Sequence, residues 1–166
     1  MRRFAVAALA LLTSLLWASG AMAQVTPTEI TQTGGLHFVG EPTVTATKTL
    51  QSAFLTATGE VAGAGTSATA TLAADATVTR GCVNRGGNEP RGLQTTEEAT
   101  AGQLTFETRQ GRGTFRVSTS PITAAPFECP SANMTPILVS VTFTDVTLTV
   151  TSQTGTTTAF FPDIDP

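Results

Sequence analysis

The strongest constraint on the fold is an alternation of apolar and polar residues between Ser67 and Thr79. Every second position is apolar: Ala68, Ala70, Leu72, Ala74, Ala76 and Val78. The positions between them are mostly threonine or aspartate. Because successive side chains of a strand point to opposite sides of a sheet, this pattern predicts a strand with one buried face and one face in water.

A second alternation lies near the C-terminus and contains a slip of one residue. Apolar side chains occupy alternate positions from Ile137 to Phe143, namely Ile137, Val139, Val141 and Phe143. The alternation breaks at Thr144 and Asp145 and resumes with Val146, Leu148 and Val150. Since one extra residue resets which side chains face inward, the slip predicts a β-bulge.

The composition supports an all-β fold. Threonine provides 34 of the 166 residues, and β-branched side chains favour extended structure. Further strands are expected at 36–39, 43–47, 53–61, 104–108, 114–118 and 157–161, with glycine or proline between several of them. The segment 104–118 is the best candidate for a hairpin. We therefore expect an antiparallel β-sandwich of about eight strands, immunoglobulin-like or related, with a barrel as the alternative.

The first 23 residues have the pattern of a secretory signal peptide. Arg2 and Arg3 precede an apolar run from Phe4 to Trp17, and Ala21-Met22-Ala23 is a small-x-small cleavage site. The run is shorter than the roughly 20 residues of a membrane-spanning helix. We expect a signal-peptide helix at 1–23, a polar and flexible N-terminal arm at 24–34, and a single β domain at 35–166. The expected location is secreted, either extracellular or associated with the cell envelope.

Charge narrows the class of partner. Removing Arg2 and Arg3 from the nine basic residues leaves seven, against twelve acidic ones. An acidic surface is poorly suited to nucleic acid or to anionic membranes. We expect neither nucleic acid nor, after signal cleavage, a membrane as partner.

The two cysteines, Cys82 and Cys129, are expected to form a disulfide, because exported compartments are oxidising. The phase of the first alternation places Cys82 on the same buried face as Leu72 and Val78. Arg80 shares that phase, so the strand is expected to leave the core near it.

The stretch Gly81-Cys82-Val83-Asn84-Arg85-Gly86-Gly87-Asn88-Glu89-Pro90-Arg91-Gly92 concentrates positive charge in an acidic chain. We interpret this stretch as a candidate loop for binding a ligand or partner. Its residues are Arg80, Asn84, Arg85, Asn88 and Arg91. Arginine forks hold carboxylate and phosphate groups well. The alternative is a solvated connection anchored by Cys82.

No constellation of catalytic or metal-binding residues is recognised. His37 is the single histidine. A general base needs a nucleophile nearby, and the sequence contains no nucleophile motif, so we expect His37 to be solvated. Glu97 and Glu98 would point to opposite faces of a strand. We expect a protein that is not an enzyme and has no cofactor or metal.

Three stretches resemble recurring elements of a group of proteins: Gly35-Leu36-His37-Phe38, Gly40-Glu41-Pro42, and the run from Cys82 to Pro90. The group comprises small secreted proteins of actinobacteria that are rich in alanine and threonine and have no assigned activity. The resemblance implies an extracytoplasmic β-rich domain. Secreted immunoglobulin-like carriers of antibiotic chromophores have a similar composition, but their usual two disulfides are absent here.

The leading hypothesis is a secreted, non-enzymatic β-domain with a binding or structural role at or outside the cell envelope. Its partner and its oligomeric state are left open. The alternatives are an extracellular small-molecule carrier, which requires an apolar cavity or cleft, and a cryptic hydrolase that uses His37.

Overall fold

The computed structural model describes residues 22–87 and 91–166. The expected signal-peptide helix lies outside these residues, except that Met22 and Ala23 begin the first strand. Within the described ranges there is no helix, and so no helix long and apolar enough to cross a membrane.

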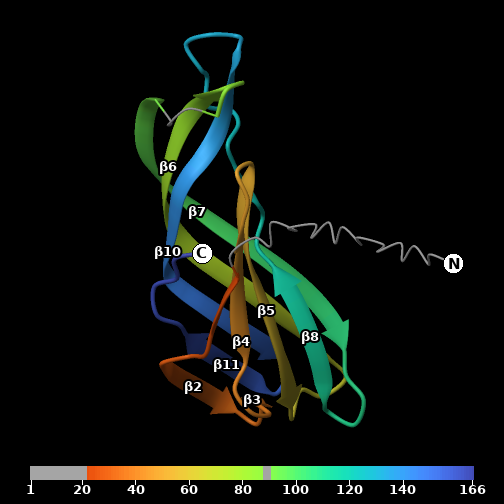
Figure 1. The fold of residues 1–166 in the computed structure, drawn as a ribbon. Helices are drawn as coiled ribbons and strands as arrows, with labels where there is room; N and C mark the ends of the chain where they lie inside the picture. The colour runs from red at the N-terminus through yellow and green to blue at the C-terminus, as the bar shows by residue number, and fades with distance from the viewer. Residues whose placement is uncertain (1–21, 88–90) are drawn as a thin grey trace, which may run out of the picture.

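The described residues form two antiparallel sheets packed face to face (Figure 1). The six-stranded sheet contains β1 (Met22–Val25), β4 (Thr43–Lys48), β5 (Ser52–Ala62) and β3 (His37–Phe38) in that order, with β8 (Gly113–Ser118) and β9 (Ile122–Thr123) also paired to β5. The five-stranded sheet has the order β2 (Glu29–Gly34), β11 (Gly155–Phe160), β10 (Met134–Ser152), β6 (Ser67–Asn84) and β7 (Arg91–Glu107). The expected sandwich is confirmed and the barrel alternative is wrong, while the strands in the described residues outnumber the eight expected.

The alternation that predicted β6 is confirmed. Its six apolar residues face the other sheet, and none of them is more than 5% exposed. The side chains between them, including Asp75 and Thr77, lie on the outer face. The strand is longer than expected and continues through Arg80 and Cys82 to Asn84.

The predicted bulge in β10 is also confirmed. Thr144 pairs with Asp75 and Thr147 pairs with Ala73, so three steps on β10 oppose two on β6. Asp145 takes up the extra length with a φ of 51°, in the left-handed region that aspartate tolerates better than most residues.

A second register shift in β10 was not expected. It lies between Leu138 and Ser140, and it buries Leu138 in place of Val139, which is half-buried. The prediction that Val139 shares the buried face is therefore wrong at that position. Val141 and Phe143 are buried on that face as predicted. Ile137 is buried too, but it pairs with Gly81 and therefore lies on the opposite face from Leu138.

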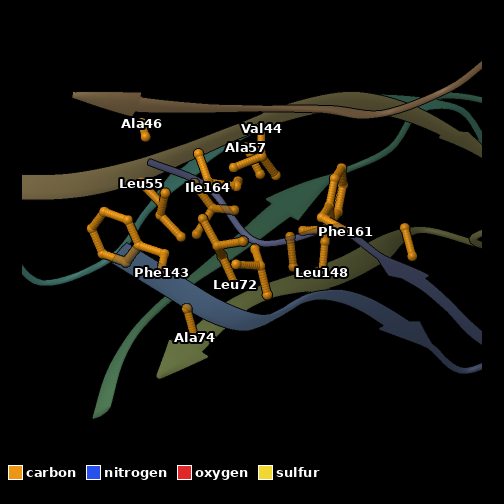
Figure 2. Close-up of a cluster of buried hydrophobic side chains, with 14 of the residues drawn as sticks. Val44, Ala46, Leu55, Ala57, Leu72, Ala74, Phe143, Leu148, Phe161 and Ile164 are labelled. Carbon is orange, nitrogen blue, oxygen red and sulfur yellow. The ribbon is translucent and has the colours of Figure 1, made fainter. Parts of the chain in front are cut away.

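The core lies between the two sheets and combines large and very small side chains. Figure 2 shows Leu55 and Val44 of the six-stranded sheet facing Leu72, Leu148 and Phe143 of the five-stranded sheet. Small residues fill much of the remaining layer, among them Ala46, Ala57, Ala70, Ala74 and Ala159. Alanine at these positions lets the sheets approach closely while the larger side chains interdigitate.

The C-terminal tail completes this core. Phe161 donates its backbone N–H to the carbonyl of Val146 at 3.0 Å, and Ile164 and Phe143 exchange two backbone hydrogen bonds of 2.9 and 3.0 Å. Through these bonds the chain after β11 continues to pair with β10 on the other side of the bulge. They also place the side chains of Phe161 and Ile164 among the core residues of both sheets (Figure 2).

The two sheets differ in length. β6 and β10 have 18 and 19 residues, whereas β5, the longest strand of the other sheet, has 11. One end of the five-stranded sheet therefore continues past the tip of the β4–β5 hairpin (Figure 1). We call this part, made of residues 79–84, 91–96 and 134–140, the distal extension.

The segment 24–34 is not a flexible arm, and that prediction is wrong. β2 pairs along its whole length with β11, from Glu29 opposite Phe160 to Gly34 opposite Gly155. Residues 24 and 25 belong to β1, which pairs with β4. All six side chains of β2 are exposed, so the strand is held by backbone hydrogen bonds and leaves no apolar alternation in the sequence.

The hairpin expected over 104–118 is also wrong. β7 pairs with β6 and β8 pairs with β5, so residues 108–112 cross from one sheet to the other. Arg109 and Arg112 close this connection with two backbone hydrogen bonds of 2.8 and 3.0 Å. The two strands still approach closely, since a Cβ on Gly102 would lie 1.8 Å from the carbonyl oxygen of Ser118.

The burial of the C-terminal tail predicts that it contributes measurably to the free energy of unfolding. Replacing Ile164, which is 2% exposed, by alanine leaves a cavity between the sheets, and we expect it to lower the free energy of unfolding by about 3 kcal/mol. Denaturation in guanidinium chloride measures the change. Asp163→Ala, an exposed neighbour, is the control and should shift stability by less than about 0.5 kcal/mol. Equal stability of the Ile164→Ala variant and the unaltered protein would contradict the assignment of the tail to the core.

Candidate functional site

The structure separates the residues of the expected binding loop. Arg80 and Cys82 are buried in β6, whereas Asn84 and Arg85 are exposed where that strand turns. Asn88 lies outside the described residues, and of Arg91 the structure describes the backbone at the start of β7 but not the side chain. The five residues therefore do not form one solvent-facing cluster.

The disulfide between Cys82 and Cys129 is present, as predicted. It joins residues 47 apart in the sequence, and Cys82 is fully buried on the face that carries Leu72 and Val78. Cys129 belongs to residues 119–133, which we call the cover segment. The disulfide holds the cover segment against the inner face of the distal extension. The β4–β5 turn contacts the same part, since Leu50 accepts from the backbone N–H of Leu138 and Gln51 Nε2 donates to the carbonyl of Pro136.

Arg80 is the second link between the distal extension and the cover segment. Its Nε and Nη2 donate to the carbonyl oxygen of Thr123 at 3.0 and 2.9 Å. Its Nη1 donates to Thr96 Oγ1 at 2.9 Å and to Glu98 Oε1 at 2.6 Å. One side chain thereby connects β6, β7 and the cover segment while being 6% exposed.

The expectation that the strand leaves the core at Arg80 is therefore wrong. A buried guanidinium is tolerated because an opposite charge and several acceptors replace the water that it loses. The same contacts exclude Arg80 from an exposed arginine fork.

Glu98 is half-buried and lies on the same side of β7 as this network. It accepts hydrogen bonds from Arg80 and, at 3.1 Å, from Thr96 Oγ1. The hydrogen bond from Arg80 holds the pKa of Glu98 below its usual range, against the opposing effect of burial. Glu97 lies on the opposite face and is exposed, as predicted for neighbouring residues of a strand.

A cleft of about 300 Å³ opens beside this ion pair. It is lined by Arg80, Gln94, Thr96, Glu98, Pro126, Phe127 and Glu128. One wall is the inner side of β7 and the other is the cover segment, so the cleft lies at the edge of the five-stranded sheet. The cleft could not be predicted from the sequence, because the residues of its two walls are about 30 positions apart along the chain.

The turn after β6 is locally braced. Asn84 Oδ1 accepts a hydrogen bond of 3.0 Å from the backbone of Gly86, and the Asn84 carbonyl accepts another of 3.0 Å from Gly87. This Asx-type arrangement fixes the chain direction just where Arg85 is exposed.

His37 is exposed at the start of β3, and its Nδ1 lies 3.1 Å from the carbonyl oxygen of Gly35. The expectation of a solvated strand histidine is confirmed. In residues 22–87 and 91–166, no group of three or more His, Cys, Asp or Glu side chains could hold a metal ion.

The outer face of the five-stranded sheet carries rows of threonine that were not recognised in the sequence. One row has one threonine from each strand: Thr33, Thr156, Thr151, Thr69 and Thr105. The next row has four threonines and a glutamine: Thr31, Thr158, Thr149, Thr71 and Gln103. Both rows are uncharged.

Comparison with protein-family models gives no match for this chain, and neither the curated proteins nor the solved structures provide one. The function is therefore argued from the site itself.

The ion pair predicts a pH dependence of stability. A carboxyl whose pKa is lowered on folding stabilises the protein above its usual pKa, and this contribution is lost as the pH falls through the lowered value. We expect Glu98→Gln to be less stable than the unaltered protein at pH 7, with a difference that shrinks as the pH falls below the usual carboxyl range. Urea denaturation at pH 7 and pH 3 measures this difference. A difference that is the same at both pH values would contradict the role of the charge.

The disulfide predicts a larger and pH-independent effect. On the chain-entropy model, opening a loop of this size costs roughly 4 kcal/mol of stability. We expect the Cys82→Ala, Cys129→Ala double variant to lose about that much in chemical denaturation. A double variant as stable as the oxidised protein would show that the cover segment needs no covalent link.

Proposed function

We propose that this chain is a secreted, non-enzymatic binding domain that acts at or outside the cell envelope and contacts its partner through the tip of the distal extension. The observation that carries the proposal is the unequal length of the two sheets. The extra length of β6 and β10 projects past the six-stranded sheet and has its own cover, fixed by a disulfide and by Arg80. A projection that is braced in this way suits a contact surface.

The chemistry of the tip supports an anionic group as the partner's contacting element. Arg85 is exposed beside two glycines on a turn that Asn84 holds in place. A guanidinium binds carboxylate or phosphate through paired hydrogen bonds. Because the hydrogen bonds of Asn84 hold the backbone of the turn, binding there mainly orders the side chain of Arg85.

Export is supported by two features. The N-terminal sequence has the order of a signal peptide, and the disulfide belongs to an oxidising compartment. A non-enzymatic role is supported by the surroundings of His37, whose hydrogen bond is to the backbone two residues before it and not to a nucleophile.

A small-molecule carrier is the second candidate function. The cleft beside Arg80 favours it, since it combines three charged groups, Arg80, Glu98 and Glu128, with the apolar side chains of Pro126 and Phe127. Its volume of about 300 Å³ lies at the lower end of the range for ligand sites.

The binding proposal predicts the effect of one substitution. We expect Arg85→Ala to weaken binding of the purified, oxidised protein to envelope fractions of the producing organism by about tenfold, the effect of losing one charge-assisted hydrogen bond. Co-sedimentation over a range of protein concentrations measures the affinity.

Arg109→Ala is the matched control, because Arg109 is an exposed arginine just beyond the opposite end of β7. It should bind like the unaltered protein. Equal losses in both variants would mean that net charge and not the tip determines binding, and unchanged binding by Arg85→Ala would overturn the assignment to the tip.

A further inference from the structure

Arg80 retains one hydrogen-bond donor that its structural contacts do not use. A guanidinium has five N–H groups. Thr123 accepts from Nε and from one N–H of Nη2, and Thr96 and Glu98 take the two of Nη1. No acceptor in the described part of the chain takes the second N–H of Nη2. Arg80 also lines the cleft.

Glu98 retains an acceptor in the same place. Its Oε1 receives both hydrogen bonds, from Arg80 and from Thr96, whereas its Oε2 has no donor among the residues that the structure describes. The side chain is 35% exposed and also lines the cleft. The floor of the cleft therefore presents a donor and an acceptor whose formal charges cancel.

The other residues that line the cleft determine the size and polarity of the ligand that fits. Pro126 and the half-buried Phe127 provide apolar surface on the cover segment, and Gln94 and Thr96 line the wall formed by β7. Glu128 adds a further negative charge at this wall of the cover segment. The space suits a small group with an apolar substituent, and the negative charge disfavours an anion.

We infer that this cleft binds a primary carboxamide. The carbonyl oxygen and the syn N–H of a primary amide lie on one edge of the group, whereas the N–H of a trans peptide bond points away from its carbonyl oxygen. The carbonyl oxygen of the bound amide accepts from Arg80 Nη2, its syn N–H donates to Glu98 Oε2, and its apolar substituent packs against Phe127. A carboxylate would place its charge beside Glu98, and an amide without a syn N–H would leave that carboxylate oxygen unpaired. Arg80 is already fixed by four hydrogen bonds, so it needs no reorganisation to bind.

Four ligands with one ring test the inference: benzamide, N-methylbenzamide, N,N-dimethylbenzamide and benzoate. We expect benzamide to bind about tenfold more tightly than the two N-methylated amides and benzoate, as the loss of one hydrogen bond to a charged group predicts. Titration of the oxidised, ¹⁵N-labelled protein measures each affinity. The shifted signals should belong to Gln94, Thr96, Glu98 and Phe127.

Four variants locate the site. Phe127→Ala should weaken benzamide binding several-fold, and Gln94→Ala, an exposed residue of the β7 wall, provides a second variant that leaves the buried network intact. Phe160→Ala is the matched control, because Phe160 is a partly exposed phenylalanine on β11, away from the cleft. Arg85→Ala should leave benzamide binding unchanged, which separates this inference from the proposed role of the tip.

Equal affinity for all four ligands would overturn the inference, because it would show that the ring alone is bound. Signals that shift away from the cleft, or no saturation at the highest soluble concentration, would overturn it as well. An N-methylated amide that binds as tightly as benzamide would exclude the role of Glu98.

Discussion

The difference in length between the two sheets is the constraint on which the distal part of the structure depends. A strand of the length of β6 or β10 exposes one apolar face along its whole length, and β5 is too short to cover all of it. Apolar surface left in water costs roughly 25 cal/mol for each Å². The cover segment and the β4–β5 turn together cover the remaining part. Cys129 of the cover segment is bonded to Cys82, and Leu50 of the turn accepts a hydrogen bond from the backbone N–H of Leu138.

Arg80 is a charged residue on the same inner face, and its burial is compensated by its hydrogen-bond partners. An ion pair taken out of water gains little net stability, but breaking it leaves an uncompensated charge and is strongly unfavourable. The pair with Glu98 therefore works mainly to specify one arrangement of β6, β7 and the cover segment. Any register in which Arg80 loses Glu98, Thr96 or the carbonyl of Thr123 is penalised.

The parts of the fold that could be predicted from sequence are those encoded locally. The alternation in β6, the bulge at Asp145 and the burial of Cys82 each depend on residues close together in the chain. β2 could not be predicted, since its exposed side chains show no pattern and its partner β11 lies more than a hundred residues away. The path of residues 104–118 was missed because glycine in a connection indicates a reversal but not the sheet to which the next strand belongs.

In the candidate site, too, some features could be predicted from the sequence and others could not. The disulfide followed from two cysteines and an export signal, and the exposed position of Arg85 followed from its glycine-rich surroundings. The burial of Arg80 was missed because its partners Glu98 and Thr123 are 18 and 43 positions away. The cleft was missed for the same reason, because it exists only when the cover segment lies against β7.

The distribution of unpaired polar groups explains why binding is assigned to the distal extension and not to the broad threonine face. On that face, hydroxyl groups of neighbouring strands hydrogen-bond to one another, as Thr69 does with Thr105 at 3.0 Å and Thr149 with Thr158 at 3.2 Å. A ligand there would have to compete with these bonds and with water, so its net gain is small. In the cleft the donor of Arg80 and the acceptor of Glu98 are already partly removed from water. A ligand that pairs with them would replace hydrogen bonds to water that burial has already weakened, and this is why the proposed amide site lies in the cleft.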